Sequence, residues 1–267
     1  MIIRGKNNGR GALEDVLESI PLMYLIFDSY GTLLEMDDFY GRLQRNFAQF
    51  GAHFPPDVIK RAAHAEMRHY MKGARLANCL GSWNNLRRDC ALILENAIRE
   101  QGHSIELAPE QVMEILSDSV VYQPFPGVKA TLSDLKKRGL RLGVLSNWDF
   151  KLKHALEDAE ILPFFDFALS SAQVGVEKPA REFFEKGFAL ARRFQPNLGR
   201  KECFYIGDHY EKDVLGARQA GLSPLWLVRD ARDIASGEIH EAERDDVPKL
   251  KSLRDLLRLF PNSLQNR

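Results

Sequence analysis

The stretch that decides the fold is Tyr24–Leu34, YLIFDSYGTLL, where a short apolar run ends in an acid and a glycine follows soon after. Leu25, Ile26 and Phe27 have the continuous apolar character of a strand that is buried on both faces, as in a parallel sheet. Asp28 follows at the carboxyl end of this strand, and ligands bind at that edge of open α/β sheets. The stretch predicts a buried strand, with Asp28 either as an active-site carboxylate or as the ordinary polar end of a strand.

Three further fragments appear downstream, each at the end of an apolar run. They are RLGVLS followed by Asn147, GVEKP containing Lys178, and CFYIG followed by Asp208 and, five residues later, by Asp213. Four such fragments in one order are much more specific than any one of them alone.

Strand and helix patterns alternate through the second half of the chain. Strands are expected at residues 141–146, 167–170, 203–207 and 224–228. Strands that alternate with helices of this length imply right-handed crossovers and a parallel sheet. From Asp37 to about Tyr122 no strand pattern appears, and apolar residues recur at helical spacing. The sequence therefore predicts an α/β fold whose first strand is separated from the others by a helical insertion.

Composition sets broad limits on the function. The chain has 267 residues, and its 37 basic and 37 acidic side chains balance, so no net charge recruits nucleic acid or an anionic membrane surface. Its three cysteines are too few and too irregularly spaced for a disulfide framework or a zinc cluster. No apolar run is long enough for a signal peptide or a membrane span. We expect a soluble cytoplasmic protein, without indication of its oligomeric state.

Together the four fragments resemble the haloacid dehalogenase superfamily, which includes phosphatases, phosphonatases, dehalogenases and P-type ATPases. The resemblance runs from about Leu22 to about Val228, and the segment from LRLGVLSN to KPAREFF looks most like the haloacid dehalogenase-like hydrolase domain-containing subgroup. It implies a Rossmann-like parallel-sheet core with an inserted helical cap. The expected parts are an amino-terminal tail at residues 1–21, a core at residues 22–36 and 124–267, and a cap at residues 37–123. A short helix is expected at Ala12–Ile20 and a last helix at Lys249–Leu259.

The resemblance also assigns roles to residues of the four fragments. Asp28 would be the nucleophile, because a carboxylate can form a covalent intermediate that divides one difficult step into two. The other implied roles are orientation of the nucleophile by Thr32, phosphoryl binding by Ser146, Asn147 and Lys178, Mg²⁺ binding by Asp28, Asp208 and the main-chain carbonyl of Tyr30, and support of this metal site by Asp213. Hard Mg²⁺ prefers such oxygen ligands. An exposed lysine at a helix start, a turn threonine and a first-turn aspartate are the structural alternatives for Lys178, Thr32 and Asp213.

Tyr30 departs from the phosphatase pattern. Family phosphatases carry a second aspartate at this position, where it protonates the leaving oxygen and later activates water. Haloacid dehalogenases carry a tyrosine there, but they tend to lack the GDxxxxD acids that Asp208 and Asp213 provide here. They also carry a tyrosine six residues after the lysine, where this chain has Phe184. The metal half of the site therefore favours a phosphatase, and the first loop favours a dehalogenase.

Several residues outside the four fragments have two interpretations. Asp149 most simply caps the helix that follows it. His209 and Tyr210 adjoin the metal loop and either supply a proton or are merely solvated. A basic and aromatic set in the expected cap either faces the site or forms a solvated helix face, and it consists of Arg68, Lys72, Arg75, Trp83, Asn84 and Arg87.

The sequence thus predicts a magnesium-dependent phosphohydrolase that acts on a small phosphorylated metabolite through an aspartyl-phosphate. Its alternatives are a metal-independent 2-haloacid dehalogenase and a binding protein of the same fold with weak turnover.

Overall fold

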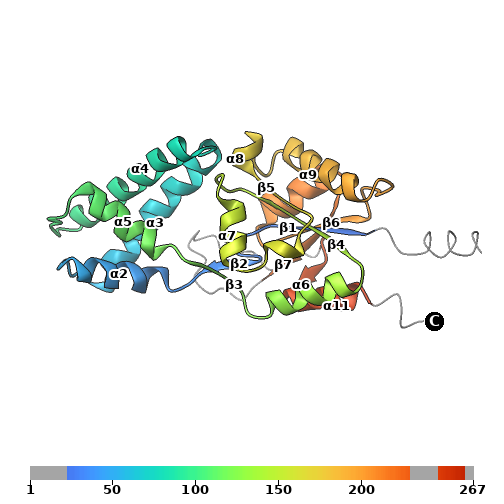
Figure 1. Ribbon diagram of the computed structural model, residues 1–267, viewed down its shortest axis with the longest axis horizontal. Coiled ribbons are helices and arrows are strands. Elements are labelled where there is room, and N and C mark those ends of the chain that lie inside the picture. Colours follow the sequence, from blue (N-terminus) through green and yellow to red (C-terminus); the bar gives the residue numbers. More distant parts are fainter. Residues whose placement is uncertain (1–22, 229–245, 262–267) are drawn as a thin grey trace, which may run out of the picture.

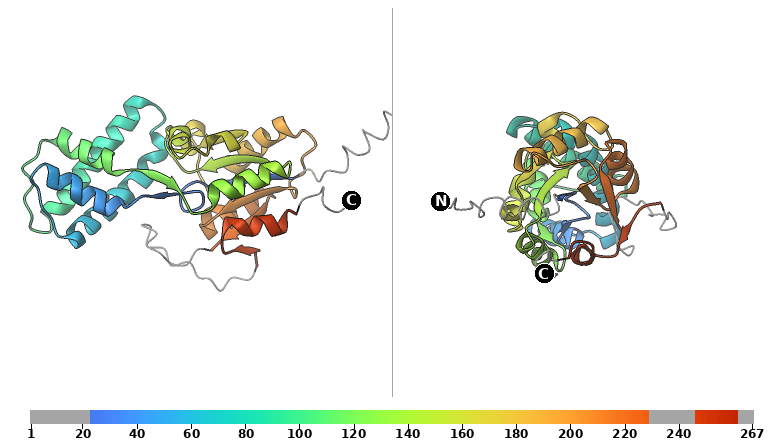
Figure 2. Two further views of the ribbon diagram at one scale, coloured as in Figure 1. Left: turned by 60° about the horizontal axis from the view of Figure 1, so that its bottom comes forward. Right: turned by 90° about the vertical axis from the view of Figure 1, so that its right-hand side faces the viewer.

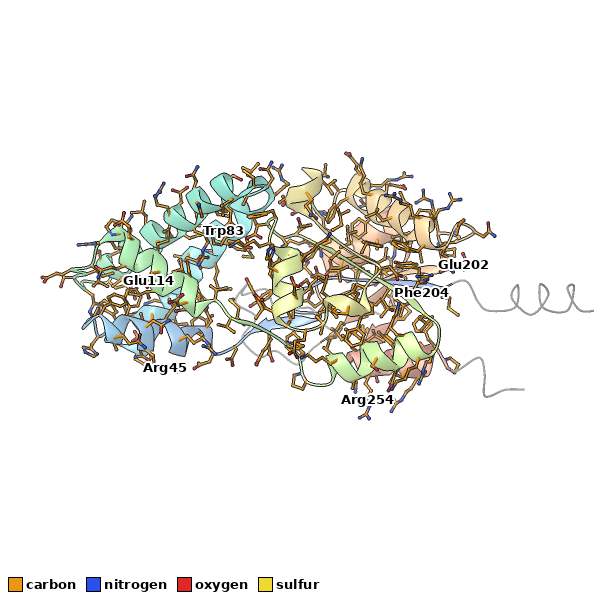
Figure 3. All side chains as sticks on the ribbon, viewed as in Figure 1. Arg45, Trp83, Glu114, Glu202, Phe204 and Arg254 are labelled. Atoms are coloured by element: carbon orange, nitrogen blue, oxygen red, sulfur yellow. The ribbon has the colours of Figure 1, made fainter. Side chains whose placement is uncertain are left out.

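The computed structural model describes residues 23–228 and 246–261. The expected tail and its short helix at Ala12–Ile20 lie outside the described residues. A group of helices lies at one end of the molecule, and a sheet with helices packed against it lies at the other (Figure 1). Figure 2 shows the same two parts from another side, with the long axis still horizontal, and from one end. Side chains fill the interior of both parts (Figure 3).

A six-stranded sheet forms the centre of the larger part. Its order is β5-β4-β1-β6-β7-β8, and every pairing in it is parallel. The strands are β1 (Tyr24–Phe27), β4 (Arg141–Ser146), β5 (Phe167–Ser170), β6 (Cys203–Gly207), β7 (Ser223–Leu227) and β8 (Lys249–Leu250). The first strand of the chain is therefore central, with β4 on one side and β6 on the other, as a right-handed doubly wound sheet requires. The predicted α/β fold with a parallel sheet is confirmed.

The apolar run of β1 is explained by burial on both faces. Leu25 and Phe27 contribute to one hydrophobic cluster, and Tyr24 and Ile26 contribute to another on the opposite face. The first cluster includes residues of α6 (Val128–Lys137), α7 (Leu152–Asp158) and α11 (Leu256–Leu259), and the second includes residues of α9 (Arg181–Phe194) and α10 (Gly216–Gln219). The shorter elements are η2 (Leu162–Phe164), α8 (Ser171–Val174), the π-helical turn η3 (Tyr210–Leu215) and η4 (Leu253–Asp255).

The helical part lies between two short strands. It contains α2 (Phe39–Gln49), α3 (Pro56–Gly73), η1 (Ala74–Leu76), α4 (Leu80–Arg99) and α5 (Pro109–Ser119). These helices bury a hydrophobic cluster of their own, and α3 packs extensively on α4. Proline at the first position starts both α3 and α5, where no intrahelical N–H bond is lost. We call this part, residues 39–119, the helical insertion.

The two strands that flank the insertion were not expected from the sequence. β2 (Leu34–Met36) pairs in antiparallel fashion with β3 (Tyr122–Pro124), so the chain leaves and re-enters the larger part side by side. Three residues in each strand are too few to show a period of two, which is why the sequence gave no signal for them.

The expected last helix at Lys249–Leu259 is wrong at its start. Lys249 and Leu250 form β8 instead, because they pair with Trp226 and Leu227 of β7. The side chain of Asp255 then accepts the N–H groups of Lys251 and Ser252, and helical structure begins only after that turn. Among the described residues, no helix combines the length and the apolar character needed to cross a membrane.

Candidate active site

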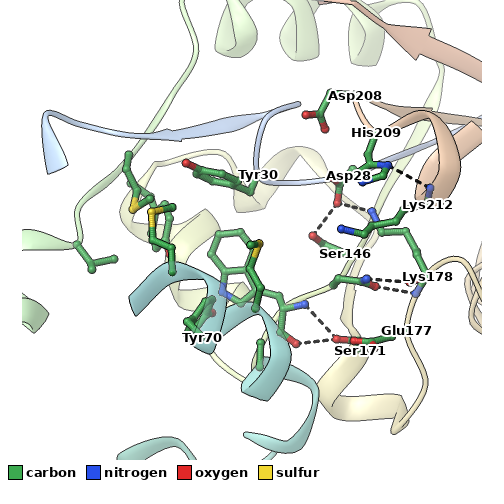
Figure 4. A pocket seen from close by; sticks show the side chains of 18 of the residues that line it. Asp28, Tyr30, Tyr70, Ser146, Ser171, Glu177, Lys178, Asp208, His209 and Lys212 are labelled. Carbon is green, nitrogen blue, oxygen red and sulfur yellow. Dashed lines mark hydrogen bonds and ion pairs between the residues drawn. The ribbon is translucent and has the colours of Figure 1, made fainter. Parts of the chain in front are cut away.

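Side chains from the carboxyl ends of three neighbouring strands meet at one edge of the sheet (Figure 4). Asp28 follows β1, Ser146 ends β4, and Asp208 follows β6, and all three are buried. The hydroxyl of Ser146 donates to Oδ1 of Asp28 at 2.7 Å. The ammonium of Lys178, which comes from the loop before α9, reaches the same oxygen at 2.7 Å. Parallel strands therefore assemble in space what the sequence places more than a hundred residues apart.

Lys178 is held on several sides. Its Nζ also lies 2.6 Å from Oδ1 of Asp213, and only 4% of the residue is exposed. Burial opposes the charged form, but the nearby carboxylates of Asp213 and Asp28 outweigh it and raise the pKa of Lys178 well above its ordinary value. The ammonium is thus permanent at neutral pH. An exposed helix-start lysine, the structural alternative, does not describe this residue.

Asn147 fixes the backbone of that lysine. Its Nδ2 donates to the Lys178 carbonyl at 3.1 Å, and its Oδ1 accepts the Lys178 N–H at 2.7 Å. Both ends of the side-chain amide are therefore used to position Lys178. Direct contact of Asn147 with a phosphoryl group stays a prediction. The helix that follows, α7, begins only at Leu152, so Ser146 and Asn147 lie before its first turn.

Three carboxylates gather around this single ammonium. Asp28, Asp208 and Asp213 each offer an oxygen within 4.8 Å of the others. With all three acids ionised, one lysine would leave two negative charges uncompensated. Burial first, and then the carboxylates of Asp28 and Asp213, raise the pKa of Asp208 to about 8. A buried cluster with excess negative charge and oxygen donors suits a hard divalent cation.

The surrounding backbone is shaped to hold these acids. Gly31 has a φ of +82°, and a Cβ at this position would lie 2.3 Å from Oδ2 of Asp208. A Cβ on Gly207 would lie 2.3 Å from Cγ of Asp213. Glycine is therefore required at position 31 both by conformation and by the close approach of the carboxylate.

Further bonds fix the orientation of the acids. Thr32 donates to Oδ1 of Asp208 at 3.2 Å, so its hydroxyl orients this acid. Its orientation of Asp28 stays a prediction. The indole of Trp226 donates to the Asp208 carbonyl at 2.9 Å. Asp213 lies in the π-helical turn, where its Oδ2 accepts the His209 N–H at 2.9 Å. Asp213 thus bridges Lys178 and its own turn, and its support of a cation site stays a prediction.

Tyr30 lines the cavity next to these groups, and its ring packs edge-on against Tyr122 at 6.4 Å between centroids. Burial, followed by smaller contributions from Tyr40 and Asp208, raises the pKa of Tyr30 far above its ordinary value. The phenol therefore stays protonated at neutral pH and cannot take a proton from water. Its main-chain carbonyl remains the predicted cation ligand.

The prediction that Asp149 caps the next helix is wrong, because α7 has Lys151 at its N-cap position and no side-chain cap. The Oδ1 of Asp149 instead accepts the Lys151 N–H at 2.7 Å in the turn before this helix. Its Oδ2, however, accepts the Tyr70 hydroxyl and the Trp83 indole N–H, both at 3.0 Å and both from the helical insertion. Burial raises the pKa of Asp149, and these bonds from Lys151, Tyr70 and Trp83 oppose that rise. This aspartate therefore ties the insertion to the sheet edge, a contact that no local sequence pattern reveals.

The basic and aromatic residues singled out in the insertion fall into an exposed group and a group that faces the rest of the protein. Arg68, Lys72 and Asn84 are exposed, as the solvated-face interpretation requires. Arg75 reaches across the boundary and donates to the Gly175 carbonyl at 3.1 Å. Arg87 is buried and lines the cavity, so it belongs to the site-facing interpretation.

Of the neighbouring residues His209 and Tyr210, one faces the cavity and the other does not. His209 lines the cavity, and its Nδ1 accepts the Lys212 N–H at 3.3 Å. The Tyr210 hydroxyl instead donates to Asp246, and its ring packs on Trp226 at 5.1 Å. Only His209 is therefore placed near the acids.

Comparison with known proteins gives concordant results. A profile of the family described as haloacid dehalogenase-like hydrolase matches residues 22–221. Haloacid dehalogenase-like hydrolase domain-containing protein 3 of Bos taurus is 34% identical over 152 residues, which are 57% of this chain and 56% of that protein. Glyceraldehyde 3-phosphate phosphatase of Methanothermobacter thermautotrophicus is 38% identical over 130 residues, which are 48% of this chain and 51% of that protein. The chain thus spans about half the length of these relatives.

The solved structure of L-2-haloacid dehalogenase from Xanthobacter autotrophicus superposes with a TM-score of 0.61. The two chains are 20% identical, and the match covers 89% of this chain and 97% of that one. This likeness concerns the fold. The family profile covers well over half of the sequence and includes all four fragments described above. The chain therefore belongs to the haloacid dehalogenase-like hydrolase family.

Proposed function

We propose that this protein is a magnesium-dependent phosphohydrolase that acts on a small phosphorylated metabolite through an aspartyl-phosphate on Asp28. The observation that carries the proposal is the buried cluster of Asp28, Asp208 and Asp213 around the single ammonium of Lys178. A bound cation would compensate the excess negative charge of this cluster. A phosphate ester is a substrate whose phosphoryl oxygens both the cation and the lysine can bind. The name of the phosphatase relative supports the same substrate class.

The residues present fit a Mg²⁺ ion. The carboxylates of Asp28 and Asp208 and the main-chain carbonyl of Tyr30 would hold it, with Asp213 in support. When bound, the ion neutralises the clustered carboxylates and the phosphoryl oxygens, which lowers the barrier to attack by an anion.

The reaction of the chain's own groups follows from their positions. The Asp28 carboxylate attacks phosphorus, and the bond from phosphorus to the leaving oxygen breaks with its electron pair on that oxygen. Ser146 and Lys178, which now contact Asp28, donate to the phosphoryl oxygens. Water then attacks phosphorus, and the bond from phosphorus to the Asp28 oxygen breaks with its electron pair on the carboxylate. Asp28 is thereby restored, and the protons of the water leave with dihydrogen phosphate. We propose that residues 37–123 form a cap over this chemistry, tied to the sheet edge through Asp149. Three free cysteines agree with the proposed cytoplasmic location.

Dehalogenation is a second candidate, favoured by Tyr30 in the first loop. Displacement of a halide needs no leaving-group proton and no cation, so three clustered acids would then only repel one another. Phe184 also gives no support, because it is fully buried against Tyr205 at 5.0 Å between ring centroids and offers no hydroxyl. The cluster therefore favours phosphoryl transfer.

A single screen separates these candidates. Release of phosphate from a panel of esters and release of halide from 2-chloropropionate are measured, each with Mg²⁺ and with a chelator. Phosphate release that the chelator abolishes supports the proposal. Halide release that persists in chelator contradicts it, and no turnover in any arm favours a binding protein.

Asp208→Asn is expected to weaken Mg²⁺ binding strongly, because it removes one anionic ligand while the amide oxygen can still accept from Thr32. Titration calorimetry measures the affinity of both proteins. Asp118→Asn, on an exposed face of α5, is the matched control and should bind as wild type does. Unchanged affinity in Asp208→Asn would show that the cation site is assigned to the wrong residues.

The same substitution is expected to stabilise the cation-free protein at high pH. The pKa of Asp208 stands at about 8 in the folded protein against an ordinary 3.8, so the folded state binds the extra proton between these values. Its contribution to stability is therefore lost as pH rises through this window. Thermal unfolding in chelator should show a higher melting temperature for Asp208→Asn at pH 8.5, by about 2–4 °C for each kcal/mol of repulsion removed, and a smaller difference at pH 5. Equal melting temperatures at both pH values would contradict this account.

A further inference from the structure

The cavity at the acidic site continues into the helical insertion. It encloses about 190 Å³, and the insertion supplies much of its wall. Apolar and aromatic side chains dominate the wall of the cavity as a whole, and they include Met36, Phe39, Met67, Tyr70, Met71 and Trp148. Methionines adapt to irregular apolar shapes, and flat rings pack on aromatic ligands. In other proteins a cavity of about 150 Å³ holds a benzene ring, so this one has room for a single substituted ring.

Two charged side chains interrupt the apolar wall within the insertion. Glu66 comes from α3 and Arg87 from α4, and both are almost fully buried. Arg87 Nη1 lies 3.6 Å from Oε1 of Glu66, which is an ion pair but longer than a hydrogen bond. The Nε of Arg87 has no hydrogen-bond partner among the described residues. A buried N–H donor without a partner is costly, and Arg87 lines the cavity, so a ligand oxygen bound there offers this side chain an acceptor.

The charges around Arg87 decide what kind of acceptor suits it. Glu66 pairs with it directly, and the nearby Asp149 carboxylate also interacts with its charge. The ring of Trp83 covers the guanidinium at 6.0 Å from the ring centroid. Two carboxylates already compensate this one positive charge, so a third anion here would be repelled by them. A neutral oxygen acceptor takes the hydrogen bond without adding negative charge.

We propose that Arg87 donates a hydrogen bond to a neutral oxygen on the organic part of the substrate, and that the cavity selects single-ring aryl phosphates with such a substituent. The assignment of the ester rests on the proposed phosphohydrolase function. Arg87 acts as a specificity residue, placed in the cavity that opens at Asp28, while the apolar wall binds the ring. The preferred substituent is a ketone or another uncharged carbonyl.

Matched substrates test this subsite. The acceptor probe is 3-acetylphenyl phosphate, 3-isopropenylphenyl phosphate has the same shape without the oxygen, and 3-carboxyphenyl phosphate adds an anion. The enzyme variant is Glu66→Gln with Arg87→Met, which removes the donor and keeps the buried pair neutral. We compare kcat/KM for each probe in wild type and variant, so that differences in leaving-group reactivity cancel. The variant should lower the acetyl-to-isopropenyl preference by about 10- to 100-fold, the range for a hydrogen bond to a charged group.

Controls keep this result interpretable. Arg88→Met changes the exposed neighbour on the same helix and should leave the preference at its wild-type value. Thermal unfolding verifies that the double variant is folded. If wild type hydrolyses no ester of the phosphate panel, the phosphohydrolase proposal fails, and calorimetric binding of 3-acetylbenzylphosphonate against 3-isopropenylbenzylphosphonate still tests Arg87. An acetyl preference that survives in the folded double variant, or a wild-type preference for the carboxyl probe over the acetyl probe, overturns the subsite.

Discussion

Asp28→Asn is expected to lower phosphate-ester hydrolysis by roughly 10⁴-fold or more, the scale seen when a catalytic nucleophile or its essential partner is removed. An amide is a poor nucleophile, and the substitution also removes one of the charges that would hold the cation. The geometry should otherwise persist. The asparagine oxygen can still accept the bond from Ser146, and Lys178 keeps its ion pair with Asp213 at 2.6 Å.

Two measurements separate loss of the nucleophile from loss of structure. Phosphate release is followed with Mg²⁺, and beryllium fluoride, which mimics a phosphoryl group on a carboxylate, is tested for tight binding to wild type and variant. Asp158→Asn, an exposed aspartate at the end of α7, is the control for a surface charge change. Substantial hydrolysis by folded Asp28→Asn would rule out the covalent mechanism.

The central strand and the acids beside it could be predicted because their signals are local. A run that is apolar on both faces is typical of a strand in the middle of a parallel sheet, and Tyr24–Phe27 has that position. The strand ends then place Asp28, Ser146 and Asp208 together without any further information. Lys178 was predicted through the four-fragment resemblance, and its burial between two carboxylates explains why a lysine is needed there.

Contacts between distant segments could not be predicted in this way. Asp149 was predicted to cap the helix after it, but α7 has no side-chain cap, and Oδ2 of Asp149 instead binds Tyr70 and Trp83, which are 79 and 66 residues away. Arg87 and Arg88 are both basic residues on α4, but one is buried and the other exposed. Which of them faces the cavity depends on how α3 packs against α4, and the charge pattern does not contain that information.

Tyr30→Asp is expected to raise the hydrolysis rate, most strongly for alkyl phosphates. The tyrosine phenol stays protonated and is a weak acid, since burial first of all raises its pKa. An aspartate would protonate the leaving oxygen and later take a proton from water, and such help is worth ~10²–10⁴-fold. An aryl oxide departs without a proton, whereas an alkoxide does not, so the gain should be larger for propyl phosphate than for 4-nitrophenyl phosphate.

Wild type, which lacks a carboxylate at position 30, should be slow in both steps of the reaction. Hydrolysis of aryl and acyl phosphates should be slow but measurable, and phosphoenzyme should accumulate in a burst because the attacking water lacks a base. Tyr30→Asn is the matched control, since it removes the ring and its contact with Tyr122 but supplies no proton-transfer group. If Tyr30→Asn accelerates hydrolysis as much as Tyr30→Asp, the gain comes from the space left by the ring. If wild type already hydrolyses propyl phosphate as fast as 4-nitrophenyl phosphate, another group supplies the proton, and His209, which lines the same cavity, is the next residue to replace.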